Sequence, residues 1–280
     1  MKKILVPIDF SPAARYGFEF AEWLTVADSN DLIAVHIATS PPYEETLSTD
    51  HIQRFKKDQK EAILQHLKRF TTPYPDHNEE AFTRIQNLRC EIRYGQVVQE
   101  ILAAAKEEEV DMIVIGTRKK HSLWDHLFGS VTTQLLIQSS IPVLVIPEGC
   151  AFKPIKKIAF ANAITGEETT TISYLEKLAK DWKADLQQVF VNTMPYDFLH
   201  NKQEVWEVPN QELGTQTINM VRETKLEHGL DLFTAQQDID LIAMMAPHRD
   251  RLQRFWHRHK RNAVAYHTHL PLLVIPAVDK

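Results

Sequence analysis

The fold is decided by Asp111-Met-Ile-Val-Ile-Gly116 and Ile141-Pro-Val-Leu-Val-Ile-Pro147, two apolar segments joined by a polar one. Both recur in the same order as Asp240-Leu-Ile-Ala-Met-Met245 and Leu270-Pro-Leu-Leu-Val-Ile-Pro276, in each case 129 residues further along the chain. Uninterrupted apolar runs of this kind are typical of parallel strands covered on both faces. Their ordered recurrence indicates that one structural unit occurs twice.

The starts of the two copies match as well. Lys2-Lys-Ile-Leu-Val-Pro-Ile-Asp9 corresponds to Lys156-Lys-Ile-Ala-Phe-Ala-Asn-Ala163, which lies 154 residues later. Because the later segments are offset by only 129 residues, the second copy is 25 residues shorter in its middle. We interpret the chain as a tandem duplication with domains at 1–148 and 154–280, and a length of 280 residues is ordinary for two domains.

Strands and helices alternate along the first copy. Apolar and alternating runs predict strands at 4–8, 32–38, 88–94, 112–115 and 143–146; helical spacing predicts helices from Ser11-Pro12 onward and over 52–70, 98–108 and 130–138. This order predicts an α/β fold of doubly wound, Rossmann-like domains, each with a five-stranded parallel sheet. In such sheets ligands bind beyond the carboxyl ends of the strands, where the strand order reverses.

Composition excludes several classes of protein. Lys+Arg is 32 and Asp+Glu is 37, so a net charge of −5 argues against a chain-wide nucleic-acid binder. Two cysteines, Cys90 and Cys150, cannot supply a disulfide framework or a Cys-rich zinc site. No apolar run approaches the roughly 18–20 residues that span a bilayer. We expect a cytoplasmic protein that contacts no membrane or nucleic acid, holds no metal ligand set and carries no catalytic Ser-His-Asp arrangement.

The segment between the two apolar runs of the first copy carries the chemistry. Gly116 ends a predicted strand, Arg118 and Lys119 follow it, and Gly129-Ser130-Val131-Thr132 opens a predicted helix. A helix N-terminus offers unpaired backbone N–H groups and a partial positive charge, which together bind anions. Asp9, at the end of the first strand, can accept hydrogen bonds from a ribose or a base. The pattern therefore predicts a phosphate-containing ligand. A purely structural interpretation stays open for each residue: Asp9 as a helix cap, Gly116 as a tight strand end, and Gly129-Ser130 as a helix start.

On these residues the chain resembles a tandem universal stress protein of the UspA superfamily, most clearly in the first copy. In the ATP-binding branch of that family the motif is Gly-x2-Gly-x9-Gly-Ser/Thr, and this sequence matches it at Gly116 and Gly129-Ser130, with Asp9 closing the first strand. The resemblance implies adenine nucleotide alpha hydrolase-like domains and a bound ATP or related adenine nucleotide, with or without Mg. The residues it implies as the site are Ile8 and Ile115 at the base, Asp9 and the backbone of Ile37 at the adenosine, and Gly129, Ser130 and Val131 at the phosphates.

This sequence departs from the motif at its second glycine, where Lys119 stands. A lysine there either fills the phosphate space or attracts the phosphates, so two readings stay open: a nucleotide-binding stress protein and a nucleotide-free interaction scaffold of the same superfamily. A third hypothesis is an adenylate-forming enzyme, but the chain lacks the glycine-rich turn that such enzymes carry after the first strand. We expect no efficient turnover, and at most slow hydrolysis of bound ATP.

The second copy lacks these residues. By the same offsets, Ala163 replaces Asp9, Met245 replaces Gly116, His248 replaces Lys119, and Arg258-His259 replaces Gly129-Ser130. We therefore expect nucleotide binding in the first copy only. The two copies end in the apolar strands Val143–Ile146 and Leu272–Ile275, and the resemblance implies that these strands pair about a pseudo-twofold axis, with a further homodimer of chains. In the middle of the second copy the sequence predicts a loop and then a helix over 213–227.

Overall fold

A computed structural model describes residues 3–26, 31–38, 49–72, 87–118, 130–150, 152–163, 168–192, 205–209, 217–223, 225–246 and 270–277. These residues form two compact units. The first unit holds the described residues up to Arg118 together with 130–135 and 143–148, and the second holds 136–142 and the described residues from Gly149 onward. In the described part of the chain, no helix is long and apolar enough to cross a membrane.

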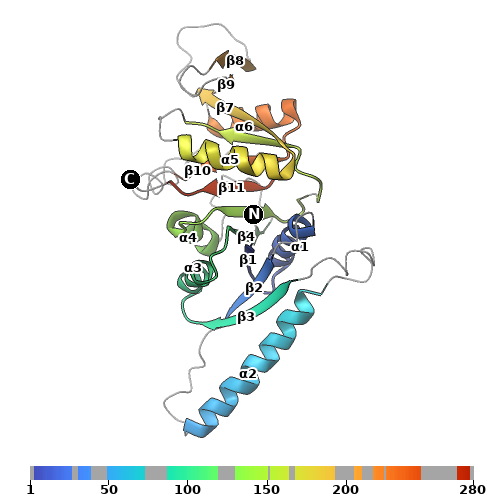
Figure 1. Cartoon of the computed structure of the whole chain (residues 1–280), viewed down its shortest axis with the longest axis vertical. Helices are drawn as coiled ribbons and strands as arrows, with labels where there is room; N and C mark the ends of the chain where they lie inside the picture. The colour runs from blue at the N-terminus through green and yellow to red at the C-terminus, as the bar shows by residue number, and fades with distance from the viewer. Residues whose placement is uncertain are drawn as a thin grey trace. The chain divides into compact units, whose positions relative to one another are not determined.

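The first unit is a doubly wound α/β domain (Figure 1). Its elements are β1 (Lys3–Pro7), α1 (Pro12–Val26), β2 (Asp31–Ala38), α2 (Thr49–Phe70), β3 (Leu88–Tyr94), α3 (Val97–Glu107), β4 (Met112–Thr117), α4 (Ser130–Gln138), of which residues 130–135 belong to this unit, and β5 (Val143–Pro147). The strands lie in the order β3-β2-β1-β4-β5, and every pair is parallel. The predicted fold class and the predicted strands and helices of this copy are confirmed.

The second unit repeats this plan with one addition. Its elements are β6 (Lys157–Ala161), α5 (Thr169–Trp182), β7 (Asp185–Asn192), β8 (Val205–Pro209), β9 (Thr217–Arg222), α6 (Leu226–Gln237), β10 (Leu241–Met245) and β11 (Leu272–Ile275). The strands lie in the order β11-β10-β6-β7-β9-β8, and only β8 is antiparallel to its neighbour.

Two expectations for the second copy are therefore wrong. Its sheet has a sixth, antiparallel strand, β8, beyond the five parallel ones. Within the range 213–227 where a helix is expected, residues 217–222 form the strand β9, and α6 begins only at Leu226; residues 213–216 lie outside the described part of the chain. The β-branched Ile218 and Val221 are both buried in this strand, and β9 gains ladder hydrogen bonds from β7 on one side and β8 on the other. Partners on both sides outweigh a weak local helical pattern.

The same set of polar contacts, here called a clamp, holds the first strand of the sheet in place in both units. In the first unit the Asp111 carboxylate accepts the backbone N–H of Lys3 at 3.0 Å, and Lys3 Nζ donates to Glu108 O at 2.9 Å. In the second unit the Asp240 carboxylate accepts the N–H of Lys157 at 3.0 Å, and Lys157 Nζ donates to Gln237 O at 2.8 Å. The two clamps tie the first strand of each unit to the turn that precedes β4 or β10, and they follow the offsets of 154 and 129 residues seen in the sequence.

Candidate functional site

The candidate site lies at the carboxyl ends of β2, β1 and β4, which are neighbours in the first sheet (Figure 1). Ile8 and Ile115 are buried there, at 3% and 7% exposure, and Ile8 N donates to Val35 O at 2.8 Å. Ile37 is half-buried and Asp9 is exposed. The parallel sheet thus brings these four predicted residues to one end of the unit, at the position where the strand order reverses.

Asp9 and Ser11 organise the turn between β1 and α1. Asp9 Oδ1 accepts the backbone N–H of Ser11 at 2.9 Å, and Ser11 Oγ accepts that of Ala14 at 3.1 Å, which makes Ser11 the N-cap of α1. The carboxylate of Asp9 therefore has a structural contact in addition to its exposed position at the strand end.

Gly116 has a packing role that the sequence did not reveal. A Cβ on Gly116 would lie 1.7 Å from Ala13 O, and a Cβ on Gly17 would lie 2.5 Å from Gly116 N, so the backbones of β4 and α1 touch at these two glycines. Neither glycine needs a left-handed backbone. The close approach of α1 thus accounts for glycine at 116 without a ligand.

The phosphate end of the site is only partly described. α4 begins at Ser130, as predicted; Ser130 is exposed, Val131 is half-buried and Thr132 is 4% exposed, so the Thr132 side chain turns inward. Arg118 is exposed. Lys119 and Gly129 lie outside the described residues, and their predicted roles stay predictions.

A cluster of aromatic rings next to Asp9 was missed by the sequence analysis. The Phe10 ring stacks on His66 at 4.1 Å between centroids and 8° between planes, lies 4.6 Å from His36, and meets Phe70 edge-on at 5.6 Å. His36 Nδ1 lies 2.7 Å from Ile8 O; because a carbonyl only accepts, Nδ1 carries the proton. The spacing of His66 and Phe70, four residues apart on a helix, was a signal that these two rings share one face.

The backbone of Phe10 is strained. Its φ is +62°, and the other non-glycine residues with positive φ among those described are Glu109, Lys183 and Asp238, each at or just beyond the end of a helix. A left-handed residue is ordinary at a helix C-terminus but costs about 1–2 kcal/mol for a bulky side chain elsewhere. The ring contacts of Phe10 offset this cost.

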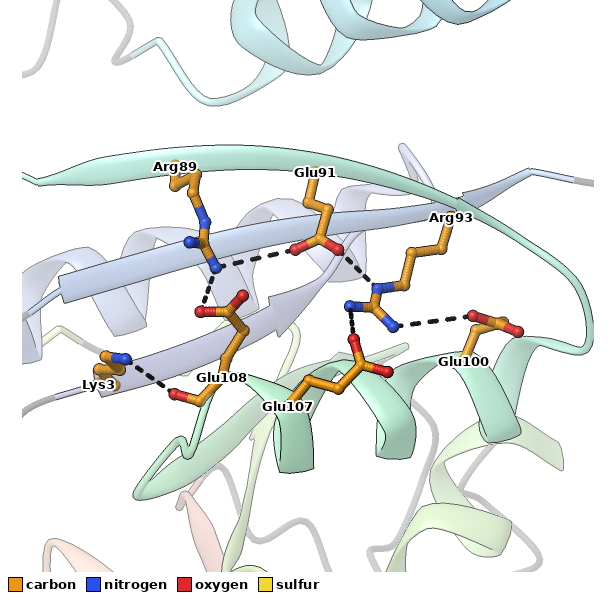
Figure 2. Close-up of polar contacts among 7 residues, drawn as sticks. All are labelled: Lys3, Arg89, Glu91, Arg93, Glu100, Glu107 and Glu108. Atoms are coloured by element: carbon orange, nitrogen blue, oxygen red, sulfur yellow. Dashed lines mark hydrogen bonds and ion pairs between the residues drawn. The ribbon is translucent and has the colours of Figure 1, made fainter. Parts of the chain in front are cut away.

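A second polar group, on β3 and α3, is structural (Figure 2). Arg93 bonds Glu91 and Glu107, each at 2.6 Å, and lies 4.0 Å from Glu100. Arg89 contacts Glu91 and Glu108. The hydrogen bond and charge of Arg93 lower the pKa of Glu107, and the same contact with Glu107 raises the pKa of Arg93. These ion pairs fasten the edge strand β3 to α3.

The second unit has different chemistry at the corresponding strand ends. Asn162 replaces Ile8 and is buried; its Nδ2 donates to Gln188 Oε1 at 2.8 Å. Ala163, at the position of Asp9, is exposed and carries no polar side-chain atom. Met245 occupies the position of Gly116, and residues 258 and 259 lie outside the described part. The described residues of the chain hold no group of three or more His, Cys, Asp or Glu side chains that could bind a metal ion.

A parallel sheet wound with helices in this strand order places the first unit in the class of doubly wound, Rossmann-like α/β domains, and comparison with known proteins identifies the family. The model of the "Universal stress protein family" matches residues 1–147. The chain therefore belongs to the universal stress protein family.

Similarity to individual proteins agrees with this assignment. The chain is 24% identical over 155 residues to Universal stress protein MJ0577 of Methanocaldococcus jannaschii, covering 52% of this chain and 94% of that protein. A universal stress protein structure from Archaeoglobus fulgidus covers 99% of this chain and 97% of its own, with a TM-score of 0.63 and 14% identity. A functionally unknown protein from Pseudomonas aeruginosa, PA1789, covers 99% of this chain and 93% of its own, with a TM-score of 0.52 and 13% identity. The structural similarities support the fold alone.

Proposed function

We propose that the chain is a stress-response regulator whose first unit binds ATP or a related adenine nucleotide and whose second unit does not. The observation that carries this proposal is the convergence of Ile8, Asp9, Ile37 and Ile115 at the carboxyl ends of three adjacent strands. In the second unit, Asn162 and Ala163 stand in place of Ile8 and Asp9. We expect the protein to act in the cytoplasm through nucleotide-dependent stability or partner affinity, with hydrolysis at most slow.

In this proposal each site residue has a distinct role. The Asp9 carboxylate accepts hydrogen bonds from the ribose or the base, the Ile37 backbone contacts the adenosine, and Ile8 and Ile115 line the base. The start of α4 supports the phosphates through Gly129, Ser130, Val131 and Thr132, with positive charge from Arg118 and Lys119; Mg would accompany the phosphates.

Calorimetric titration of the purified chain with Mg-ATP, ADP and AMP tests the proposal. Asp9→Asn is a suitable variant because Asn keeps an oxygen that can accept the Ser11 N–H, so the turn is retained while the charge is lost. We expect Asp9→Asn to weaken binding about tenfold, the scale of one charged hydrogen bond. Asp58→Asn, at an exposed position on α2, serves as the matched control and should bind like the wild type. Absence of heat and of thermal stabilisation at millimolar nucleotide would reject the proposal.

A nucleotide-free interaction scaffold is the second candidate. It is favoured by the structural roles of two site residues: Asp9 holds Ser11 N, and Gly116 admits α1. Mass spectrometry of small molecules released from the protein as purified separates the two candidates, because a co-purifying adenine nucleotide contradicts the scaffold.

We also propose that Val143–Ile146 and Leu272–Ile275 pair with each other within the chain, and that chains associate as a homodimer. Within its own unit each strand is hydrogen-bonded along one side, β5 to β4 and β11 to β10. Residue-resolved hydrogen exchange tests the pairing, because only alternate amides of each strand bond to that neighbour. Protection of the remaining amides supports pairing, and rapid exchange of those amides contradicts it. Light scattering reports whether the chain is a dimer.

A further inference from the structure

The C-terminal turn of α2 is fastened to the turn that contains Asp9. Leu67 and Thr71 are buried at 0% and 2% exposure, whereas the helix from residue 57 to 66 is exposed or half-buried throughout. Figure 1 shows that the rest of α2, toward its N-terminus, extends away from the sheet. The position of α2 on the first unit therefore depends strongly on its last turn.

Arg15 of α1 provides one part of the attachment. Its Nη1 donates to Phe70 O and its Nη2 to Thr72 O at 3.0 Å, and its guanidinium lies 5.5 Å from the centre of the Phe70 ring. Nε of Arg15 donates to Glu19 at 2.7 Å, which orients the guanidinium. A cation bonded to the carbonyls at and just beyond the C-terminus of a helix is favourable because the last helical carbonyls have no partner within the helix.

Phe10 provides a further part, in addition to the contact of Thr71 with Cys90 on β3. Its ring stacks on His66 and meets Phe70, both on α2, while its backbone follows directly after Asp9. The hydrogen bond from Ser11 N to Asp9 Oδ1 joins the residues on either side of Phe10, whose backbone is left-handed. A change in the partner of the Asp9 carboxylate thus acts on the backbone that aims the Phe10 ring.

We propose that Phe10 is a positioning residue that couples ligand binding at Asp9 to the attachment of α2. The inference rests on the proposed nucleotide function. A ribose or base group that bonds to Asp9 competes with Ser11 N, relaxes the strained turn and loosens the stack of Phe10 on His66. The coupling acts in both directions: ligand binding weakens the stack of Phe10 on His66, and a weaker stack raises the affinity for the ligand.

Hydrogen exchange of the full chain, with and without Mg-ATP, tests the coupling together with nucleotide affinity. We expect nucleotide to speed exchange in the peptide that covers residues 64–72. His66→Ala removes the stack from an exposed position and should bind nucleotide about three- to tenfold more tightly, the scale of one aromatic pair. His66→Phe restores a ring and should return the affinity to the wild-type value, while Gln65→Ala on the same exposed turn should leave it unchanged.

The outcomes separate the two proposals. If no adenine nucleotide binds the wild type, the proposed function and the coupling both fail. If nucleotide binds but leaves exchange of residues 64–72 unchanged, and His66→Ala binds like the wild type, the coupling is wrong and the nucleotide function stands. If His66→Phe behaves like His66→Ala, ring stacking is not the coupling contact and the proposal is overturned.

Discussion

The third parallel strands of the two units, β3 and β9, occupy the same place beside β2 and β7 but have opposite chemistry. Glu91 and Arg93 on β3 align with Val35 and Ile37, and Asn219 and Val221 on β9 align with Val189 and Val191. Arg93 forms ion pairs with α3, whereas Val221 is fully buried and packs with Leu230 and Phe233 of α6.

The difference follows from the neighbours of each strand. Among the described strands β3 is an edge, and charged side chains on an edge strand discourage pairing with other chains. β9 is covered by the antiparallel strand β8, so apolar residues on it are protected. The clamps of Asp111 and Asp240 are retained in both units, while the strand-end residues differ. The scaffold is thus common to the units, and the edge and the candidate site distinguish them.

The largest expected effect concerns the glycine contact that only the first unit has. Gly116→Ala would place a Cβ 1.7 Å from Ala13 O, so α1 must move away from β4. We expect a loss of about 3 kcal/mol in the free energy of unfolding of the first unit, at the upper end of typical overpacking costs. Urea unfolding, monitored by hydrogen exchange of peptides from the first unit, measures this loss of free energy.

Met245→Ala is the matched control, because Met245 stands at the corresponding position of the second unit and already carries a side chain. It should cost about 1 kcal/mol through lost packing, without displacing α5. Similar losses for both variants would show that the close approach of α1 and β4 is not specific to the first unit.

The second effect compares the two clamps. Asp240 is 8% exposed, and its carboxylate accepts the N–H groups of Lys156 and Lys157 and pairs with Lys153 at 2.6 Å, whereas Asp111 is exposed. We expect Asp240→Asn to cost about 2 kcal/mol and Asp111→Asn at most about 1 kcal/mol.

Acid unfolding gives this comparison a pH signature. Burial raises the pKa of Asp240, but the Lys153 contact and the two backbone N–H groups outweigh it, so the pKa lies below the ordinary 3.8. The stabilisation is therefore present above pH 3.8 and lost as the pH falls through the lowered pKa. Second-unit stability in Asp240→Asn should fall less steeply below pH 4 than in the wild type. An equally steep fall would contradict the assigned role of Asp240.

The sequence predicted the first unit well because its signals are local. Continuous apolar runs, helical spacing and the Ser11-Pro12 start fix nine elements whose observed bounds lie close to the expected ones. β8 and β9 were missed because each is stabilised by pairing with a strand far from it or across a loop, and only weakly by local preference.

The candidate site divides in the same way. Ile8, Asp9, Ile37 and Ile115 could be placed together because parallel strands end at one edge of a sheet. The contact of Gly116 with Ala13 and Gly17 could not be predicted, since it joins residues about a hundred positions apart in the chain. The left-handed backbone of Phe10 is held by rings from β2 and α2, so nothing in its immediate sequence indicates it.

The third effect is a gain of stability. Burial and the neighbouring Glu19 raise the pKa of Glu22 to about 7, although Arg15 opposes the shift, and Glu22 Oε1 is buried with no hydrogen-bond partner among the described residues. A carboxyl with a raised pKa costs stability once it ionises, so the first unit should weaken between pH 4.5 and pH 8. Glu22→Gln should be neutral near pH 4.5 and stabilise the first unit by about 1–2 kcal/mol at pH 8.

Glu176→Gln is the control for this change, because Glu176 holds the corresponding position on α5 and is exposed. Thermal unfolding of both variants at the two pH values should show a pH-dependent gain only for Glu22→Gln. A gain of the same size at both pH values would assign the effect to packing and exclude ionisation of Glu22.

The smallest effect returns to the edge strand. Arg93→Val gives β3 the residue that β9 carries at the corresponding position, without the β8 strand that protects it. Because the Glu107 partner of Arg93 is exposed and screened by solvent, we expect only a small loss of stability, reduced further at high salt. NMR titration should show the pKa of Glu107 returning toward its ordinary 4.5, since the Arg93 contact is what lowers it. Loss of this charge from the edge strand should also increase self-association, measured by light scattering, and Arg93→Lys should not. An Arg93→Val variant that stays as dispersed as the wild type would mean that charge on β3 is not what keeps this edge from pairing.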